Sequence, residues 1–196
     1  MMRRDDCLKV LARRRTDEIV VAAYMAAQEW IHISPSDLNY TCIGAMGQAS
    51  SHALGIALGR PDRRVGVLDG DGSLLMNLGT LVTIGQAAPR NLLHIVCRNN
   101  TYETNGSVPI PGAAQVSFTG LARAAGYPRT WEFEDLAAWE EHVDQVLREE
   151  GPVLVELRMV PGDPYPEDFK RLASIPHRDA FRALMAGPRA DPGSQA

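Results

Sequence analysis

The sequence predicts an α/β protein of three layers, in which helices cover both faces of a central, mostly parallel sheet. Three runs are dominated by apolar residues, at 65–68, 92–97 and 153–160, which is typical of strands buried on both faces. Segments with helical spacing separate these runs, as crossovers between parallel strands require. The carboxyl ends of parallel strands then meet at one edge of the sheet, where ligands of open α/β sheets bind.

The elements of the first half alternate between helix and strand. In order, we expect a helix over 1–30, a strand over 40–43, a helix over 47–58, a strand over 65–68 and a helix over 74–88. Leu8, Leu11 and Tyr24 are apolar positions among many charges, which predicts the first helix. The second helix is rich in small residues, and Pro89 ends the third.

The second half continues the alternation. In order, we expect a strand over 92–97, a loop over 99–116, helices over 118–126 and 135–149, and a strand over 153–160. Leu136, Trp139, Val143 and Val146 mark one buried stripe on the last helix. The tail 187–196 is rich in Pro, Gly, Ser and Ala and is expected to be disordered. The chain is therefore expected to form a single domain over 1–186, with its motif core at 40–160.

Composition excludes several classes of protein. The 196 residues carry a formal net charge of −4, which excludes the broad basic surface of a dedicated nucleic-acid binder. The three cysteines form no CxxC pair, so neither a disulfide framework nor a Cys-type zinc site is expected. The chain has no apolar run long enough to span a membrane and no signal peptide pattern at its start. These observations predict a cytoplasmic protein that binds neither nucleic acid nor membrane.

Two polar clusters follow neighbouring strands of the predicted sheet. Residues 69–73 read Asp-Gly-Asp-Gly-Ser directly after the strand 65–68, and residues 99–104 begin with two asparagines after the strand 92–97. If the two strands are neighbours, Asp71 and Asn100 converge. A carboxylate, an amide oxygen, a backbone carbonyl and phosphate oxygens form the ligand set that Mg²⁺ prefers. The sequence therefore predicts a site for a metal ion and an anion at this edge.

The two clusters together resemble a known motif. Gly70-Asp71-Gly72-Ser73 followed by Asn99-Asn100 is similar to the GDG…NN motif of enzymes that depend on thiamine diphosphate. The resemblance extends upstream to the segment 44–50, Gly-Ala-Met-Gly-Gln-Ala-Ser, and covers roughly residues 40–160. In this stretch the chain resembles the diphosphate-binding domain of phosphonopyruvate and sulfopyruvate decarboxylases. The resemblance implies the thiamine diphosphate-binding fold and a 2-oxo acid decarboxylase activity.

The resemblance also implies which residues hold the metal and the cofactor. Asp71 and Asn100 would bind Mg²⁺ through their side chains, and Tyr102 through its backbone carbonyl. The residues implied to contact thiamine diphosphate are Gly44, Met46, Gly70, Asp71, Gly72, Ser73, Asn100 and Tyr102. Gly44 would offer its carbonyl to the exocyclic amine of the cofactor, and Met46 would support the bent shape of the cofactor.

Two positions depart from the decarboxylases, and both are candidates for a catalytic role. Gln48 stands where those enzymes usually have His, and Glu103 opens the segment 103–109, which differs from their TGGQP-like stretch. In this family the activating glutamate comes from a pyrimidine-binding domain. Glu18 and Glu29 lie on the expected first helix, with charges that we interpret as solvated. The resemblance therefore implies a separately encoded α subunit, an assembly of α₂β₂ type or larger, and no activity of this chain alone.

Other functions remain open at this point. Within the family, a carboligase or another subunit that processes aldehydes or 2-oxo acids is an alternative. Asp69, Asp71 and Ser73 also match the DxDG[ST] motif of haloacid-dehalogenase-type, Mg²⁺-dependent phosphatases, although only Lys9 and Lys170 supply lysines. A non-catalytic, cofactor-binding subunit is a third alternative. An EF-hand is excluded because its sixth loop position, which must be Gly, is Leu74 here.

Overall fold

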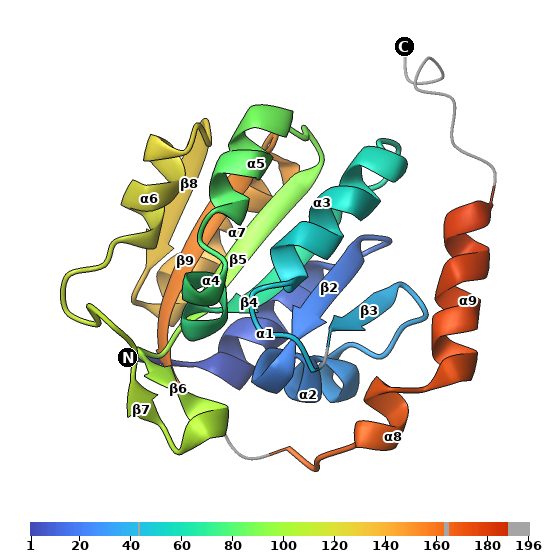
Figure 1. The fold of residues 1–196 in the computed structure, drawn as a ribbon, viewed down its shortest axis with the longest axis horizontal. Coiled ribbons are helices and arrows are strands. Elements are labelled where there is room, and N and C mark those ends of the chain that lie inside the picture. Colours follow the sequence, from blue (N-terminus) through green and yellow to red (C-terminus); the bar gives the residue numbers. More distant parts are fainter. Residues whose placement is uncertain (43, 163–164, 188–196) are drawn as a thin grey trace.

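A parallel sheet of seven strands forms the centre of the molecule, confirming the predicted fold class (Figure 1). The computed structural model describes residues 1–42, 44–162 and 165–187. Five strands follow one another across the sheet: β3 (Asn39–Cys42), β2 (Ile19–Ala23), β4 (Val65–Gly70), β5 (Leu92–Arg98) and β9 (Val153–Val160). Both β8 (Arg129–Phe133) and β1 (Met2–Arg3) pair with β9, alongside different parts of it. Residues 188–196 of the expected disordered tail lie outside the described part.

Helices cover both faces of this sheet (Figure 1). One face packs against α1 (Arg4–Arg14), α2 (Tyr24–Ile33) and α7 (Leu136–Arg148). The other packs against α3 (Ala49–Gly59), α4 (Asp71–Met76), α5 (Thr80–Ala87) and α6 (Phe118–Ala124). The chain ends with α8 (Phe169–Leu172) and α9 (Ile175–Ala186). In the described residues, no helix is both long and apolar enough to cross a bilayer.

The expected helix over 1–30 is wrong, because a strand of the sheet interrupts it. Ile19–Ala23 forms β2, which is buried throughout and pairs in parallel with both β3 and β4. Five consecutive apolar residues fit a strand buried on both faces, and that burial overrides the helical spacing of the residues around them.

Three smaller differences concern the second layer, the central sheet and the loops. The expected helix 74–88 is two helices, α4 and α5, because the segment between them turns at Asn77, whose side-chain amide binds the carbonyl of Gly47. Strand β8 was not expected. The expected loop 99–116 contains the short hairpin β6 (Thr101–Tyr102) and β7 (Val108–Pro109), with the 3₁₀ turn η1 (Glu103–Asn105) between them. The expected buried stripe on α7 is confirmed for Trp139, Val143 and Val146.

Candidate functional site

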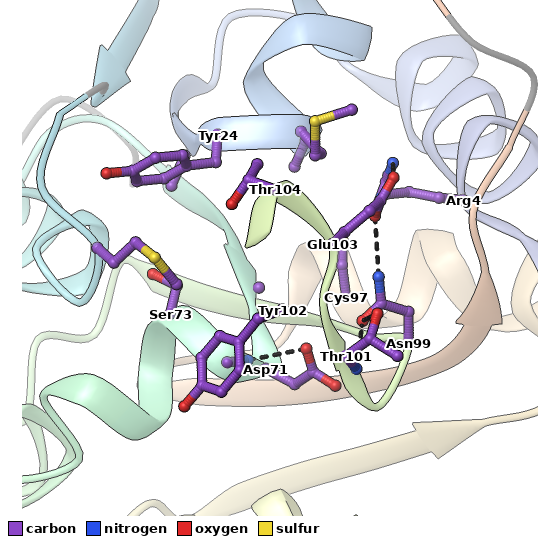
Figure 2. Close-up of a pocket in the computed structure, with 16 residues that line it drawn as sticks. Arg4, Tyr24, Asp71, Ser73, Cys97, Asn99, Thr101, Tyr102, Glu103 and Thr104 are labelled. Atoms are coloured by element: carbon purple, nitrogen blue, oxygen red, sulfur yellow. Dashed lines mark hydrogen bonds and ion pairs between the residues drawn. The ribbon is translucent and has the colours of Figure 1, made fainter. Parts of the chain in front are cut away.

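A pocket opens at the carboxyl edge of the sheet, where β2, β4 and β5 end (Figure 2). Its walls combine the two sequence clusters with residues from the amino-terminal segment. The residues that line it include Arg4, Tyr24, Met46, Gly70, Asp71, Gly72, Ser73, Asn99, Tyr102 and Glu103. The topology explains this convergence, because parallel strands place the segments that follow them on the same edge.

The structure brings Asp71 and Asn100 together. Strands β4 and β5 pair in parallel, with Gly70 opposite Cys97, so the segments that follow them begin side by side. The backbone N–H of Asn100 donates to Oδ2 of Asp71 over 2.6 Å, and that of Gly72 donates to Oδ1 over 2.8 Å. Asn100 has a φ of 62°, a left-handed conformation that Asn tolerates better than most residues. The Asp71 carboxylate is therefore fixed at the start of α4 beside the asparagine pair.

Burial changes the acidity of this carboxylate. Asp71 is 2% exposed, and the loss of solvent raises the pKa of its carboxyl group to about 6. The backbone hydrogen bonds from Gly72 and Asn100, and the positive charge of Arg98, oppose the rise without cancelling it. A buried carboxylate whose charged form is this costly gains from a bound cation.

The loop before α3 is attached to α4 through Gly47. The backbone N–H of Gly47 donates to Oγ of Ser73 over 2.9 Å, and the carbonyl of Gly47 accepts from the side-chain amide of Asn77 over 2.9 Å. Gly47 has a φ of 78°, and a Cβ there would lie 2.8 Å from Cβ of Asn77. Only glycine fits this conformation and close approach. Met46, the residue before Gly47, lines the pocket together with Gly70 and Ser73.

Gly72 makes room for an aromatic ring. A Cβ at Gly72 would lie 2.6 Å from the ring of Tyr102, so the absence of a side chain lets that ring cover the first turn of α4 (Figure 2). The carbonyl of Tyr102 accepts from the backbone N–H of Ser107 over 3.1 Å, and Tyr102 pairs with Val108 in the short β6–β7 hairpin. Neither Gly70 nor Gly72 has a positive φ. The close approach of the Tyr102 ring, and not a left-handed backbone, therefore explains the glycine at position 72.

Glu103 belongs to a buried charge network that the sequence did not predict. Both oxygens of Glu103 accept from Arg4, over 2.6 and 3.1 Å, and Asn99 donates to it over 2.9 Å (Figure 2). Arg4 also donates to Glu29 over 2.7 Å. The interpretation of Glu29 as solvated is wrong, since it is 2% exposed and burial raises the pKa of its carboxyl group. An arginine near the start of the chain gave no signal of this, because the sequence placed it on a continuous solvated helix.

Gln48 and Asp69 lie outside the pocket wall. Gln48 precedes α3, and its carbonyl accepts from the backbone N–H of His52 over 3.0 Å. Asp69 is fully buried, and its carboxylate faces His94 at 3.6 Å beneath the helices of the second layer. A phosphatase nucleophile must reach its substrate, so the burial of Asp69 argues against the phosphatase alternative.

The oxygens at this edge fit a hard cation that a second molecule helps to bind. The Asp71 carboxylate and the Asn100 side-chain oxygen each have a lone pair beyond the hydrogen bonds described. In the described part of the chain, no group of three or more His, Cys, Asp or Glu could hold a metal ion by itself. The ligands that Mg²⁺ would still need fit the phosphate oxygens of a cofactor.

Comparison with known proteins identifies the family. The model of the thiamine pyrophosphate enzyme C-terminal, TPP-binding domain matches residues 20–157. Phosphonopyruvate decarboxylase of Streptomyces viridochromogenes is 36% identical over 93% of this chain, and this chain spans 46% of that enzyme. Sulfopyruvate decarboxylase subunit beta of Methanothermobacter thermautotrophicus is 34% identical over 83% of this chain and 85% of the subunit.

A solved structure supports the same fold. Benzoylformate decarboxylase from Polynucleobacter necessarius superimposes with a TM-score of 0.65 over 83% of this chain and 34% of that chain, at 22% sequence identity. The family match includes both polar clusters and the strands β2, β4 and β5 that position them. The phosphatase alternative is thereby overturned. The chain belongs to the thiamine pyrophosphate enzymes, as a domain of their C-terminal, cofactor-binding type.

Proposed function

We propose that this chain is the thiamine diphosphate- and Mg²⁺-binding β subunit of a heteromeric 2-oxo acid decarboxylase, of the phosphonopyruvate or sulfopyruvate type. The relatives named phosphonopyruvate decarboxylase and sulfopyruvate decarboxylase subunit beta support this assignment. The observation that carries it is the hydrogen bond from the Asn100 backbone N–H to the Asp71 carboxylate, which joins the ends of β4 and β5.

Each residue at this edge has a proposed task. Asp71, Asn100 and the carbonyl of Tyr102 hold Mg²⁺ against the diphosphate, which Gly70, Gly72 and Ser73 approach from the first turn of α4. Gly44 and Met46 bind the cofactor from the loop before α3. When bound, thiamine diphosphate supplies the electron sink that lets a 2-oxo acid release CO₂.

We further propose that the activating glutamate comes from a partner. Glu29 and Glu103 both form ion pairs with Arg4, so we assign the activating proton transfer to neither of them. This chain aligns with 85% of a protein that is itself named as a β subunit. That match supports a separately encoded partner, which we propose is a pyrimidine-binding α subunit in an α₂β₂-type or larger assembly. The free cysteines Cys7, Cys42 and Cys97 are all buried, which suits a cytoplasmic, reducing location.

A binding experiment tests the site. Thiamine diphosphate with Mg²⁺ at 100 times its Kd stabilises the native state by about 2.7 kcal/mol. For a chain of this size that is a rise in Tm of roughly 5–10 °C. Asp71→Ala should abolish the rise, whereas the matched control Asp17→Ala, at an exposed carboxylate on the opposite edge, should retain it. A normal rise in the Asp71 variant would refute the site.

An activity experiment tests the substrate class and the partner. The assembled enzyme should release CO₂ from phosphonopyruvate or sulfopyruvate faster than from pyruvate, and the isolated chain should release none. Indifference to all three acids, with carboligation or aldehyde oxidation instead, would contradict the decarboxylase assignment. Full turnover by the chain alone, with no other protein in its mass spectrum, would contradict the two-chain assembly. Cofactor binding without turnover, whichever partner is supplied, would favour a non-catalytic subunit.

A further inference from the structure

Arg98 holds the side-chain oxygen of Asn100 in a fixed direction. It is the last residue of β5, is 5% exposed, and its Nε donates to Oδ1 of Asn100 over 2.8 Å. Because Nε is only a donor, it selects the oxygen of the amide and not the nitrogen. The backbone N–H of Asn100 is separately tied to Asp71. The two contacts fix both the backbone and the side chain of Asn100.

The guanidinium of Arg98 is itself immobilised. Nη2 donates to the carbonyl of Ala113 over 2.8 Å, and Nη1 donates to Glu156 on the neighbouring strand β9. Glu156 is fully buried, and its other oxygen accepts from the backbone N–H groups of Phe118 and Thr119 over 3.1 and 3.3 Å. All three nitrogens of Arg98 therefore have partners, and the guanidinium cannot turn away from Asn100 without leaving a buried charge unpaired.

We infer that Arg98 is a positioning residue for the metal site, an inference that rests on the proposed function of Asn100 as a ligand of Mg²⁺. The amide oxygen of Asn100 has two lone pairs, of which Arg98 occupies one and leaves the other for the metal. Partners of this kind orient a ligand and increase its basicity or polarity without touching the ion.

Glu156 has a second task in this arrangement. A guanidinium beside a divalent cation would repel it, and the repulsion would be strong in a site shielded from water. The buried Glu156 carboxylate neutralises Arg98, so the pair orients Asn100 without adding net charge near the metal. Loss of the Glu156 charge alone should therefore weaken Mg²⁺ binding even though Arg98 remains.

The test is a calorimetric titration of Mg²⁺ at a fixed concentration of thiamine diphosphate, well below the Tm of each variant. Arg98→Met combined with Glu156→Gln removes both charges, a change that buried ion pairs often tolerate. Its apparent Kd for Mg²⁺ should rise about 10–100-fold, the usual cost of losing such a partner. The single variant Arg98→Lys keeps the positive charge but should also bind Mg²⁺ more weakly than the wild type. One ammonium group cannot reproduce the contacts that the guanidinium makes with Asn100, Ala113 and Glu156.

A matched control and a coupling measurement separate positioning from general stability. Arg158 is the register partner of Arg98 on β9 and also contacts Glu156, but it pairs with Glu132 and Glu134 on the surface. Arg158→Met should leave the Kd for Mg²⁺ unchanged. In an Asn100→Ala background, the paired change at Arg98 and Glu156 should cause no further loss, since the residue that they position is gone.

The remaining outcomes each decide the matter. Unchanged Mg²⁺ affinity in the paired variant, with normal binding by the wild type, would overturn this inference and leave the proposed function intact. No Mg²⁺ binding by the wild type would overturn the proposed function and the inference with it. Failure of both the Arg98→Lys and the paired variant to fold would show that Arg98 serves the core as a whole, which also overturns the inference.

Discussion

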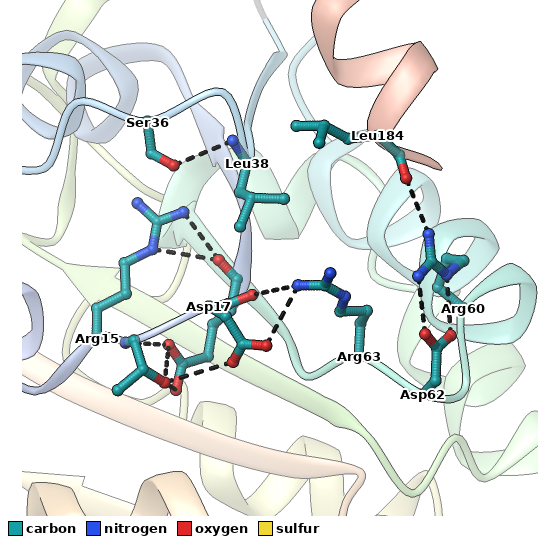
Figure 3. Close-up of polar contacts among 10 residues, drawn as sticks. Arg15, Asp17, Ser36, Leu38, Arg60, Asp62, Arg63 and Leu184 are labelled. Carbon is teal, nitrogen blue, oxygen red and sulfur yellow. Dashed lines mark hydrogen bonds and ion pairs between the residues drawn. The ribbon is translucent and has the colours of Figure 1, made fainter. Parts of the chain in front are cut away.

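The two edges of the sheet use charged residues in different ways. At the amino edge, the segment before β2 carries Arg15 and Asp17, and the segment before β4 carries Arg60 and Arg63 (Figure 3). Arg60 donates to both oxygens of Asp62, over 2.9 and 2.7 Å, and to the carbonyl of Leu184 over 3.0 Å. These contacts stabilise the turn before β4 and join it to the end of α9.

At the carboxyl edge, charged groups are buried with hydrogen-bonding capacity left over. Buried atoms with no hydrogen-bond partner among the described residues include Nε of Arg4, Oε2 of Glu29 and both oxygens of Asp69. Asp71 is buried enough for the pKa of its carboxyl group to rise to about 6. At the amino edge, Nε of Arg64 is likewise buried without a hydrogen-bond partner in the described residues.

The difference shows what marks a functional edge in this fold. The two edges carry similar residue types, so the number of charges does not distinguish them. At the amino edge, Arg60 pairs with Asp62 and Arg63 pairs with Asp17. At the carboxyl edge the pocket is lined by the buried Asp71 carboxylate, whose charged form is costly and would be stabilised by a bound cation.

The largest expected effect comes from breaking the buried charge network at the carboxyl edge. Arg4→Met leaves Glu29 and Glu103 facing each other without a cation, and removal of one partner from a buried pair costs about 3–5 kcal/mol. Urea unfolding should show this loss in the free energy of unfolding. Adding Glu29→Gln should recover part of it. A loss below about 1 kcal/mol would mean that the network is solvated and that the two edges do not differ.

The next effect is a pH dependence at Asp71. Its pKa is raised from 3.8 to about 6 in the native state, so the native state binds its proton more tightly than the unfolded state. The stabilisation from this proton is complete below pH 3.8 and is lost as the pH rises through about 6. The total loss is about 3 kcal/mol for a shift of about two units.

The measurement compares cofactor-free wild type with Asp71→Asn between pH 4.5 and 7.5. The variant does not titrate, so its advantage in Tm should grow as the pH rises. Addition of Mg²⁺ with thiamine diphosphate should stabilise only the wild type, and less at pH 5.5 than at pH 7.5, because protons compete with the metal for the carboxylate. A constant difference between the two proteins across this range would contradict the raised pKa.

Much of this comparison could be predicted from the sequence. Continuous apolar strands and the two polar clusters placed Asp71 and Asn100 at one edge, because parallel topology constrains where strand ends meet. Strand β2 carries the same signal, a run of five apolar residues, but the helical spacing on either side of Ile19–Ala23 obscured it. Arg4 could not be found in this way, because it reaches Glu103 across 99 positions of sequence. Arg98 was likewise hidden, since its role follows from the placement of β9 beside β5.

The smallest expected effect lies at the amino edge and sharpens the comparison from the other side. Arg63 donates to Asp17 over 3.2 Å, and the two side chains are 32% and 72% exposed. Exposed pairs contribute about 0–1 kcal/mol because water screens the attraction and ordering two side chains costs entropy. Arg63→Ala should therefore change the free energy of unfolding by less than about 1 kcal/mol and leave the Tm rise with thiamine diphosphate and Mg²⁺ as in the wild type.

Urea unfolding at low and high salt, with the double variant Arg63→Ala, Asp17→Ala, isolates the pair from other effects of truncation. A loss comparable to that of Arg4→Met, or a reduced Tm rise with ligand, would show that the amino edge also carries energetically demanding charges and would remove the contrast between the two edges.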